Sequence, residues 1–455
     1  MTSTAIPRRL VRSASAGTAV GATTRPDALC WAVVAMGLAY VWRLQVLQPE
    51  LLMPLRLGIV TTAIAIVLWS NGKDPMGRWS RLQELLPVRL VLALSLVAIA
   101  GIPLGLYPGA TLAFFRVVFL GLILYMLLTA ASVRSRVDLE RLMLAHVVGA
   151  LIFGLFVLWK AGGRGGRLSG LSAYDPNDFA FLLVCTIPLA VYFMRTTAKP
   201  MLRALTAFAV VLFVVLLVRT GSRGGFLGFI ATMLYLLFRF KGISVRIRIA
   251  AIAVGLVTLS LAASDEYWEL MGTIRSESDY NRTEKGGRIE VWKRGLGYMK
   301  DHPFVGVGLN QFGVAEGASE LNQARVAEGK GWVAAAAHNS FIQMGVETGF
   351  IGLGLFMALV GASLGACSWR APPRPTQADM DEQALARALA GALVGFCVAG
   401  FFLSQAYSAY LYSLLGMVAG LLKLRKYAPL HAPAAAALAL PAQGTRRAQL
   451  TRRRG

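Results

Sequence analysis

The sequence predicts an all-α polytopic membrane protein, and three observations lead to that class. Apolar residues make up 56% of the 455 residues and charged residues only 15%, and the mean hydropathy is +0.59. Apolar runs of about 20 residues recur along the chain, each long enough to cross a bilayer as a helix. One long polar segment, residues 265–337, interrupts these runs and has room for helices outside the bilayer.

The apolar runs define about twelve spans. They lie at residues 29–48, 51–70, 88–107, 110–130, 142–160, 177–195, 203–219, 223–240, 246–264, 338–366, 383–405 and 407–424. The predicted organisation is a disordered basic tail (1–28), nine helices (29–264), a large loop (265–337), three helices (338–424) and a second disordered basic tail (425–455). An even number of spans places both termini on the same side of the membrane.

Lysine and arginine in the connections predict the orientation. With the N-terminus inside, every inside connection is basic, including residues 73–81, 134–141, 195–203 and 239–248. Because basic residues are retained on the cytoplasmic side, both termini are expected to be cytoplasmic and the loop 265–337 periplasmic. The same rule accounts for most of the net charge of +23, so a nucleic-acid partner is not predicted.

Several basic residues lie on the outer side, against that rule. Among them are Arg167, Arg219, Arg223 and Arg288. Orientation does not explain them, whereas an anionic ligand on that side does. Guanidinium groups and the N–H groups of the glycine-rich helix start after Arg223 together suit a pyrophosphate. Which of Arg219 and Arg223 faces the anion stays open.

His338 is the candidate catalytic residue. It opens an apolar run on the outer side and faces the basic loop, which would keep the imidazole neutral. A neutral imidazole that titrates near physiological pH is suited to act as a general base. A residue at a helix start can equally be a cap or a packing residue, so both interpretations stay open from position alone.

Residues 174–178 (YDPND) have the composition of a helix start. Asp175 or Asn177 can cap the helix, and the proline between them fits the first turn. Asp175 could instead orient an arginine or the acceptor. Tyr174, Asp175, Asn177 and the histidine's neighbour Asn339 are therefore the candidate substrate-positioning residues.

The large loop has predicted internal order. Residues 287–300 indicate an amphipathic helix on the outer membrane surface. Its apolar stripe is Ile289, Trp292, Leu296 and Met299. The helix should end at 301–303, a glycine turn should follow at 306–308 and a second helix at 316–330.

Cofactor motifs are missing from the sequence. It contains no nucleotide-binding loop, no Asp-X-Asp pair and no Ser-His-Asp or Cys-His spacing, and its four cysteines lack metal-ligand spacing. We therefore predict no cofactor and no metal, with an activated lipid phosphate as the energy source.

These stretches resemble the O-antigen ligase/polymerase superfamily. The resemblance is carried by residues 167–170 (RLSG), 175–177 (DPN), 220–225 (TGSRGG), 287–292 (GRIEVW), 302–312 (HPFVGVGLNQF), 337–343 (AHNSFIQ) and 347–352 (ETGFIG). Within the superfamily, twelve spans with one dominant periplasmic loop are most similar to the ligase that joins O-antigen to lipid A–core. The resemblance implies a GT-C-type glycosyltransferase of the bacterial inner membrane that acts on the periplasmic face without metal or nucleotide.

The resemblance also implies substrates and roles. The donor would be undecaprenyl-diphosphate-linked O-antigen and the acceptor a sugar hydroxyl of lipid A–core, in lipopolysaccharide biosynthesis. The family's essential histidine matches His338, its loop arginine matches Arg288, and a second arginine matches Arg223. The preferred reaction is one inverting displacement. The alternatives are O-antigen polymerase, protein O-oligosaccharyltransferase or, in a different class, a flippase for the lipid-linked glycan.

Overall fold

The computed structural model describes residues 27–72, 74–161, 167–239, 263–273, 286–331, 335–368 and 376–427, and single residues at 284 and between 246 and 260. These parts are all-helical apart from one isolated bridge between Gly170 and Tyr174. Most of the two predicted tails, residues 1–26 and 428–455, lies outside the described residues. Residues 425–427, predicted to be disordered, belong instead to the last described helix.

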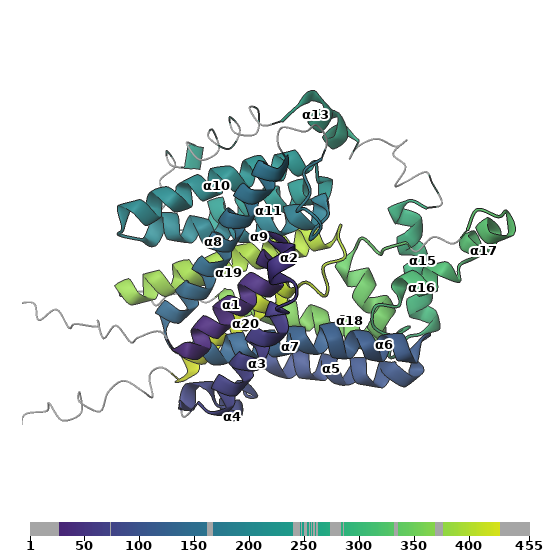
Figure 1. The fold of residues 1–455 in the computed structure, drawn as a ribbon, viewed down its shortest axis with the longest axis horizontal. Coiled ribbons are helices and arrows are strands. Elements are labelled where there is room, and N and C mark those ends of the chain that lie inside the picture. The colour runs from purple at the N-terminus through teal and green to yellow at the C-terminus, as the bar shows by residue number, and fades with distance from the viewer. Residues whose placement is uncertain are drawn as a thin grey trace, which may run out of the picture.

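The helices follow the apolar runs closely (Figure 1). They are α1 (Ala28–Tyr40), α2 (Pro49–Leu52), α3 (Leu57–Ser70), α4 (Trp79–Leu82), α5 (Leu86–Leu104), α6 (Pro108–Phe114), α7 (Leu120–Ser132), α8 (Arg136–Ala161), α9 (Pro176–Thr196), α10 (Pro200–Thr220), α11 (Arg223–Arg239), α13 (Asp265–Gly272), α15 (Arg288–Asp301), α16 (Phe312–Gly317), α17 (Glu320–Ala327), α18 (Ser340–Cys367), α19 (Gln377–Gly400) and α20 (Ala409–Tyr427).

Seven described helices are long and apolar enough to cross a membrane. They are α5, the continuous stretch Pro108–Ser132, α8, α9, α10, α18 and α19, and the shorter α1 and α3 are also apolar. The described chain thus has the helices of a multi-pass membrane protein. The count of twelve stays a prediction, since the run 246–264 lies mostly outside the described residues.

Two predicted spans are shorter than their apolar runs. The run 29–48 is helical only to Tyr40, and the run 51–70 becomes continuously helical only from Leu57. Arg43 and Arg56 adopt the left-handed conformation, with φ of 44° and 45°, and break each helix. Hydropathy alone does not report such a break.

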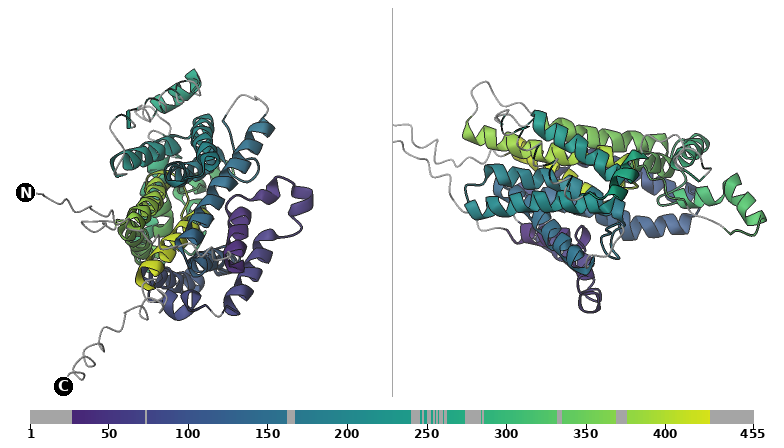
Figure 2. Two further views of the ribbon diagram at one scale, coloured as in Figure 1. Left: turned by 90° about the vertical axis from the view of Figure 1, so that its left-hand side faces the viewer. Right: turned by 90° about the horizontal axis from the view of Figure 1, so that it is seen from above.

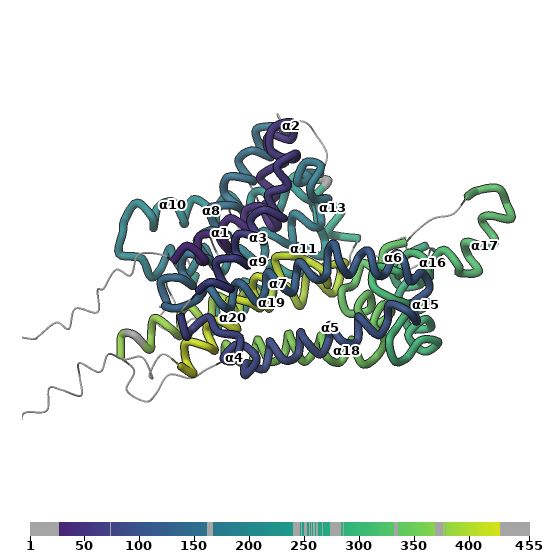
Figure 3. The backbone as a smooth tube through the Cα atoms, turned by 60° about the horizontal axis from the view of Figure 1, so that its bottom comes forward, coloured from purple at the N-terminus to yellow at the C-terminus, as the bar shows by residue number. Residues whose placement is uncertain are grey.

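The centre of the bundle is formed by α9, α19 and α20, whose side chains are mostly buried. The helix α9 packs against α10 and α19, α11 packs against α19, and α20 packs against α7. Small residues allow these helices to pack closely. A Cβ added to Gly225 in α11 would lie only 2.6 Å from the Cβ of Ala180 in α9. Below this core, α5 and α18 run side by side towards α15 and α16 (Figure 3).

The bundle has two ends. At one, the site end, α9 and α18 begin, and α15, α16 and α17 lie there, with α17 at the tip of the molecule (Figures 1 and 2). At the other, the opposite end, α7 ends and α8 begins. Asp27 before α1 pairs there with Arg134, and Lys423 of α20 donates to the Ala130 carbonyl at 2.6 Å. The first described helix therefore begins at the opposite end, and the last described helix ends there.

The helix α18 is interrupted at Gly349, where φ is 69°. The turn after α15 occupies the break: the Phe350 N–H donates to the Pro303 carbonyl at 2.8 Å, and the Val307 N–H to the Val346 carbonyl at 2.9 Å. The buried carboxylate of Glu347 accepts from the Asn310 N–H at 2.6 Å. These bonds tie the loop to α18 on both sides of the break, including the part that begins beside His338.

Replacing Gly306 by alanine should destabilise this junction strongly. Gly306 has a φ of 71°, and an added Cβ would lie 2.4 Å from the Glu347 carbonyl carbon. Left-handed strain and overpacking together should cost about 2–4 kcal/mol, measured as the thermal unfolding midpoint in detergent. Gly297→Ala in α15 is the control, because nothing lies within 4 Å of its added Cβ and helix propensity should raise stability slightly. Equal midpoints for the two variants would contradict the prediction.

Candidate functional site

His338 lies immediately before α18, half-buried and in the left-handed conformation with φ of 45°. The backbone N–H of His338 donates to the Ser404 hydroxyl at 2.9 Å. The helix cap is its neighbour: the Asn339 side-chain oxygen accepts from the N–H groups of Phe341 and Ile342 at 2.9 and 3.1 Å. The capping role considered for His338 thus belongs to Asn339.

Charged groups from two other segments act on the His338 imidazole. Burial lowers the pKa of His338, the Arg288 guanidinium lowers it further, and the Asp175 carboxylate raises it. The net effect favours the neutral form at pH 7. Groups at the starts of α9 and α15 thus act on the imidazole that precedes α18.

Asp175 caps α9, as one of the two sequence interpretations held. Its carboxylate accepts from the N–H groups of Asn177 and Asp178 at 2.7 and 2.8 Å. Capping does not exclude the other interpretation, because the same carboxylate also influences His338. The cap therefore holds a negative charge at a fixed place near the imidazole.

Arg167 connects the start of α9 to the turn between α10 and α11. Its guanidinium donates to the Asn177 side-chain oxygen and to the Thr220 carbonyl, both at 2.9 Å. The adjacent Leu168 N–H donates to the Arg219 carbonyl at 2.8 Å. Two of the sequence motifs, RLSG and TGSRGG, thus lie against each other although they are far apart in the chain.

Arg223 and Arg219 take different positions around this turn. The Arg223 guanidinium donates to the Thr273 hydroxyl at the end of α13, at 2.6 Å. The Ser222 hydroxyl accepts from the Gly225 N–H at 3.1 Å, so it caps α11. Arg219 enters the described hydrogen bonds through its carbonyl, which accepts from Leu168. The structure brings Arg167 together with Asn177, and the charges of Arg288 and Asp175 act on the His338 imidazole.

Tyr174 anchors its loop to the end of α1. Its hydroxyl donates to the Val41 carbonyl, and the Arg43 guanidinium lies 4.7 Å from its ring centroid. Burial raises the pKa of Tyr174 to about 12, so the phenol is protonated at pH 7. Its observed role is to fix the loop that leads into α9.

Sequence reasoning missed the turn between α19 and α20. Besides the Ser404 contact with His338, the Gln405 N–H donates to the Ser340 hydroxyl at 2.8 Å. The Gln405 side chain donates to the Asp178 carboxylate. This turn therefore joins the starts of α9 and α18. The available signal was the polar pair Ser404-Gln405 between two apolar runs.

The amphipathic helix predicted at 287–300 is present as α15, and the face that it buries against protein shares Met299 with the predicted apolar stripe. Val291, Gly295 and Met299 are buried, whereas Ile289 and Leu296 are 36% and 48% exposed. The reason is close packing against α18: a Cβ on Gly295 would lie 2.8 Å from Ile342. The helix thus packs on protein through this face.

Two further contacts fix α15 and hence the start that carries Arg288. The Trp292 indole N–H donates to the Ala337 carbonyl at 2.9 Å, next to His338. Arg294 forms a forked ion pair with the buried Glu316 of α16, at 2.9 and 2.7 Å. This ion pair raises the pKa of Arg294. The second helix predicted at 316–330 corresponds to the shorter α17, and the preceding α16 was not predicted.

Within the described parts of the chain, no group of three or more His, Cys, Asp or Glu side chains could hold a metal ion. The polar and titratable groups of the site end belong to an all-helical, membrane-type bundle and surround a half-buried, neutral imidazole. These features define a polytopic membrane protein with a charged site at the ends of its helices.

Comparison with known families agrees with the resemblance. The family model described as O-antigen ligase (Wzy_C) matches residues 208–357, from α10 to α18. Over this range the chain is similar to that family, whose members are glycosyltransferase-like ligases and polymerases. The matched range contains Arg219, Arg223, Arg288 and His338. A search of curated proteins finds no match.

Proposed function

We propose that the protein is a membrane glycosyltransferase that transfers O-antigen from undecaprenyl diphosphate to lipid A–core. The observation that carries the proposal is the half-buried position of His338 before α18, where the charges of Arg288 and Asp175 act on its imidazole. His338 and Arg288 both lie in the range that is similar to the O-antigen ligase family. A transfer of this kind needs a base for the acceptor and positive charge for the departing diphosphate.

In the proposed mechanism, His338 removes the proton of an acceptor sugar hydroxyl. The hydroxyl oxygen attacks the anomeric carbon of the donor, and the bond from that carbon to the phosphate oxygen breaks. The electron pair leaves with undecaprenyl diphosphate, whose charge Arg288 and Arg223 stabilise. One displacement inverts the anomeric centre. Arg167, Arg219, Tyr174, Asp175, Asn177 and Asn339 would position the donor and acceptor or the groups around them.

The direct test is reconstitution. Purified protein would be incubated with lipid-linked O-antigen and lipid A–core, and the joined product detected by gel mobility and mass spectrometry. A product with one O-antigen chain on lipid A–core supports the ligase. Extension of the lipid-linked chain instead would identify a polymerase, and glycosylated protein an oligosaccharyltransferase. Transport of the glycan without a new bond would identify a flippase.

The energy for transfer should come from the donor itself. Activity is expected to persist in EDTA and without ATP, because the diphosphate is already a good leaving group. The measurement is the initial rate of product formation in chelator-treated buffer compared with buffer containing magnesium and ATP. A strict requirement for magnesium would contradict the proposed role of the arginines.

The proposed orientation places the site end in the periplasm and both termini in the cytoplasm. A cysteine replacing Arg325 in the exposed helix α17 should react with an impermeant thiol reagent added to whole cells with a permeable outer membrane. A cysteine replacing the exposed Arg89 at the opposite end should react only after lysis. The reverse labelling pattern would show that the topology is inverted. A donor in the periplasm could then not reach the site end, and the proposal would be contradicted.

A further inference from the structure

A second polar site lies at the opposite end of the bundle, away from His338. It is a partly open cavity of about 290 Å³ between the end of α3, the short helix α4 and the link from α7 to α8. Its lining includes Leu68, Trp69, Asp74, Arg78, Trp79 and Arg134. None of these residues takes part in the proposed transfer reaction.

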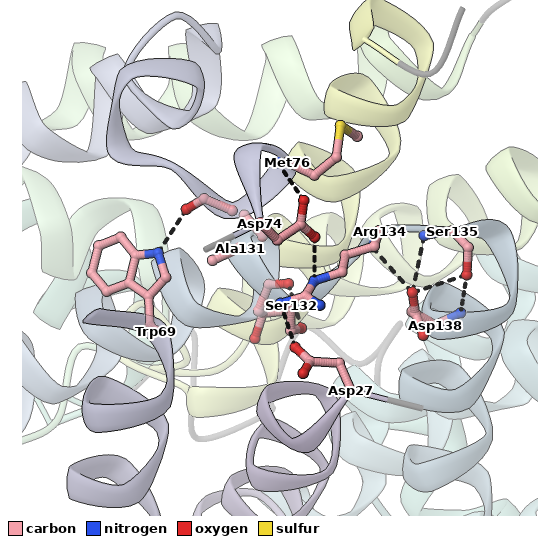
Figure 4. Close-up of polar contacts among 12 residues, drawn as sticks. Asp27, Trp69, Asp74, Met76, Ala131, Ser132, Arg134, Ser135 and Asp138 are labelled. Carbon is pink, nitrogen blue, oxygen red and sulfur yellow. Dashed lines mark hydrogen bonds and ion pairs between the residues drawn. The ribbon is translucent and has the colours of Figure 1, made fainter. Parts of the chain in front are cut away.

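The floor of this cleft is built from ion pairs (Figure 4). Arg134 forms ion pairs with Asp27 at 2.5 Å and with Asp74 at 2.6 Å. The other oxygen of Asp74 accepts from the Met76 N–H at 2.8 Å. The side chains of Arg134 and Asp74 remain 30% and 24% exposed, so both signs of charge reach the cleft.

The aromatic wall of the cleft is also fixed. The Trp69 indole N–H donates to the Gly77 carbonyl at 2.7 Å, which holds its ring along one side. Trp79 is 42% exposed, and Arg78 beside it is exposed. Tryptophan and arginine at the ends of apolar helices are typical of the level of lipid headgroups.

An exposed apolar stripe on α3 runs to this cleft. Val60, Ile64 and Val67 recur at helical spacing and are 46%, 48% and 57% exposed. On a helix of a membrane protein, such a stripe faces acyl chains. The stripe ends one turn before Ser70, which itself lines the cleft. A lipid whose tails lie along α3 would therefore have its headgroup at the cleft.

We propose that this cleft binds a zwitterionic phospholipid headgroup that carries a phosphodiester and a primary ammonium, as in phosphatidylethanolamine. Arg78 would bind the phosphate through paired N–H donors. The ammonium would lie against Asp74 and the face of the Trp79 indole. An anionic headgroup would match Arg78 but would bring no cation to the exposed part of the Asp74 carboxylate, whose one ion-pair partner among the described residues of the cleft is Arg134.

The test is competitive lipid retention. Purified protein would be equilibrated with equal amounts of phosphatidylethanolamine and phosphatidylglycerol with identical acyl chains, and bound lipid counted by native mass spectrometry. Wild type should retain predominantly phosphatidylethanolamine. Arg78→Ala should reduce retention about tenfold, as expected for a lost hydrogen bond between charged groups, and Trp79→Ala should also reduce it.

Arg89→Ala is the matched control, since Arg89 is an exposed arginine at the same end that lies outside the cleft and donates to the Gln83 carbonyl. It should retain lipid like wild type. The proposal is overturned if the two lipids are retained equally, if phosphatidylglycerol is preferred, or if Arg78→Ala and Arg89→Ala behave alike. Absence of any retained lipid in wild type would overturn it as well.

Discussion

Replacement of His338 by alanine is expected to lower turnover by a factor on the order of 10²–10⁴, the loss typical of a removed general base. Folding should persist, because the α18 cap is the Asn339 side chain. Donor binding should persist too, because the anion contacts are assigned to arginines. Turnover and donor affinity would be measured separately with purified protein.

His338→Asn is the most informative substitution at this position. Asparagine tolerates the left-handed conformation observed at residue 338 but cannot act as a base near neutral pH. His338→Asn should therefore be stable and as inactive as the alanine variant. Near wild-type transfer by His338→Asn would exclude His338 from proton transfer.

The pH dependence should follow the same group. Because burial and Arg288 lower the pKa of His338, the neutral base should persist below the ordinary value of about 6.5. Activity is thus expected to stay level at and above neutral pH and to fall only in more acidic buffer. Asp175→Asn, which can still cap α9, removes a charge that raises this pKa and should move the acidic limb to lower pH.

Replacement of Arg288 by alanine is expected to reduce turnover by about 10²–10³, the cost of removing a group that stabilises developing negative charge. Arg288→Lys should restore little, because an ammonium cannot make the paired contacts of a guanidinium. Since Arg288 lowers the pKa of His338, its loss should also move the acidic limb of the pH profile to higher pH. That shift distinguishes a charge near the imidazole from a purely structural arginine.

Lys293→Ala is the control on the same helix. Lys293 is 66% exposed and pairs with Glu290 one turn earlier, a surface contact of small energy. Its removal should leave rate and pH profile near wild type. If Arg288→Ala and Lys293→Ala had equal transfer rates, the basic residues of α15 would form only a solvated face.

Hydropathy predicted the helices well because a bilayer requires long apolar runs. The described helices α9 and α10, Pro176–Thr196 and Pro200–Thr220, start and end within a few residues of their runs at 177–195 and 203–219. The cap at Asp175 was predictable because capping is local. The neighbourhood of His338 and Arg288 was predictable in outline, since both lie in or beside one loop.

Tertiary contacts explain the structural features that could not be predicted from the sequence. The buried face of α15 includes Gly295, which an apolar pattern does not count, yet its lack of a side chain lets α18 approach. The hydrogen bonds from Gln405 to Ser340 and Asp178 join segments that are distant in the chain. The cleft at Arg134 combines two connections, α3 to α4 and α7 to α8, that orientation rules treat only as positive charge.

The interruption of α18 at Gly349 has a mechanical consequence. The turn 303–308 is bonded to residues 346–350, and α15 packs on the first part of α18. Val346 and Phe350 lie on opposite sides of Gly349, so the turn spans the break and opposes bending of α18 there. The spacing between the proposed base His338 and the proposed anion-binding Arg288 should therefore stay constant although the helix is interrupted nearby.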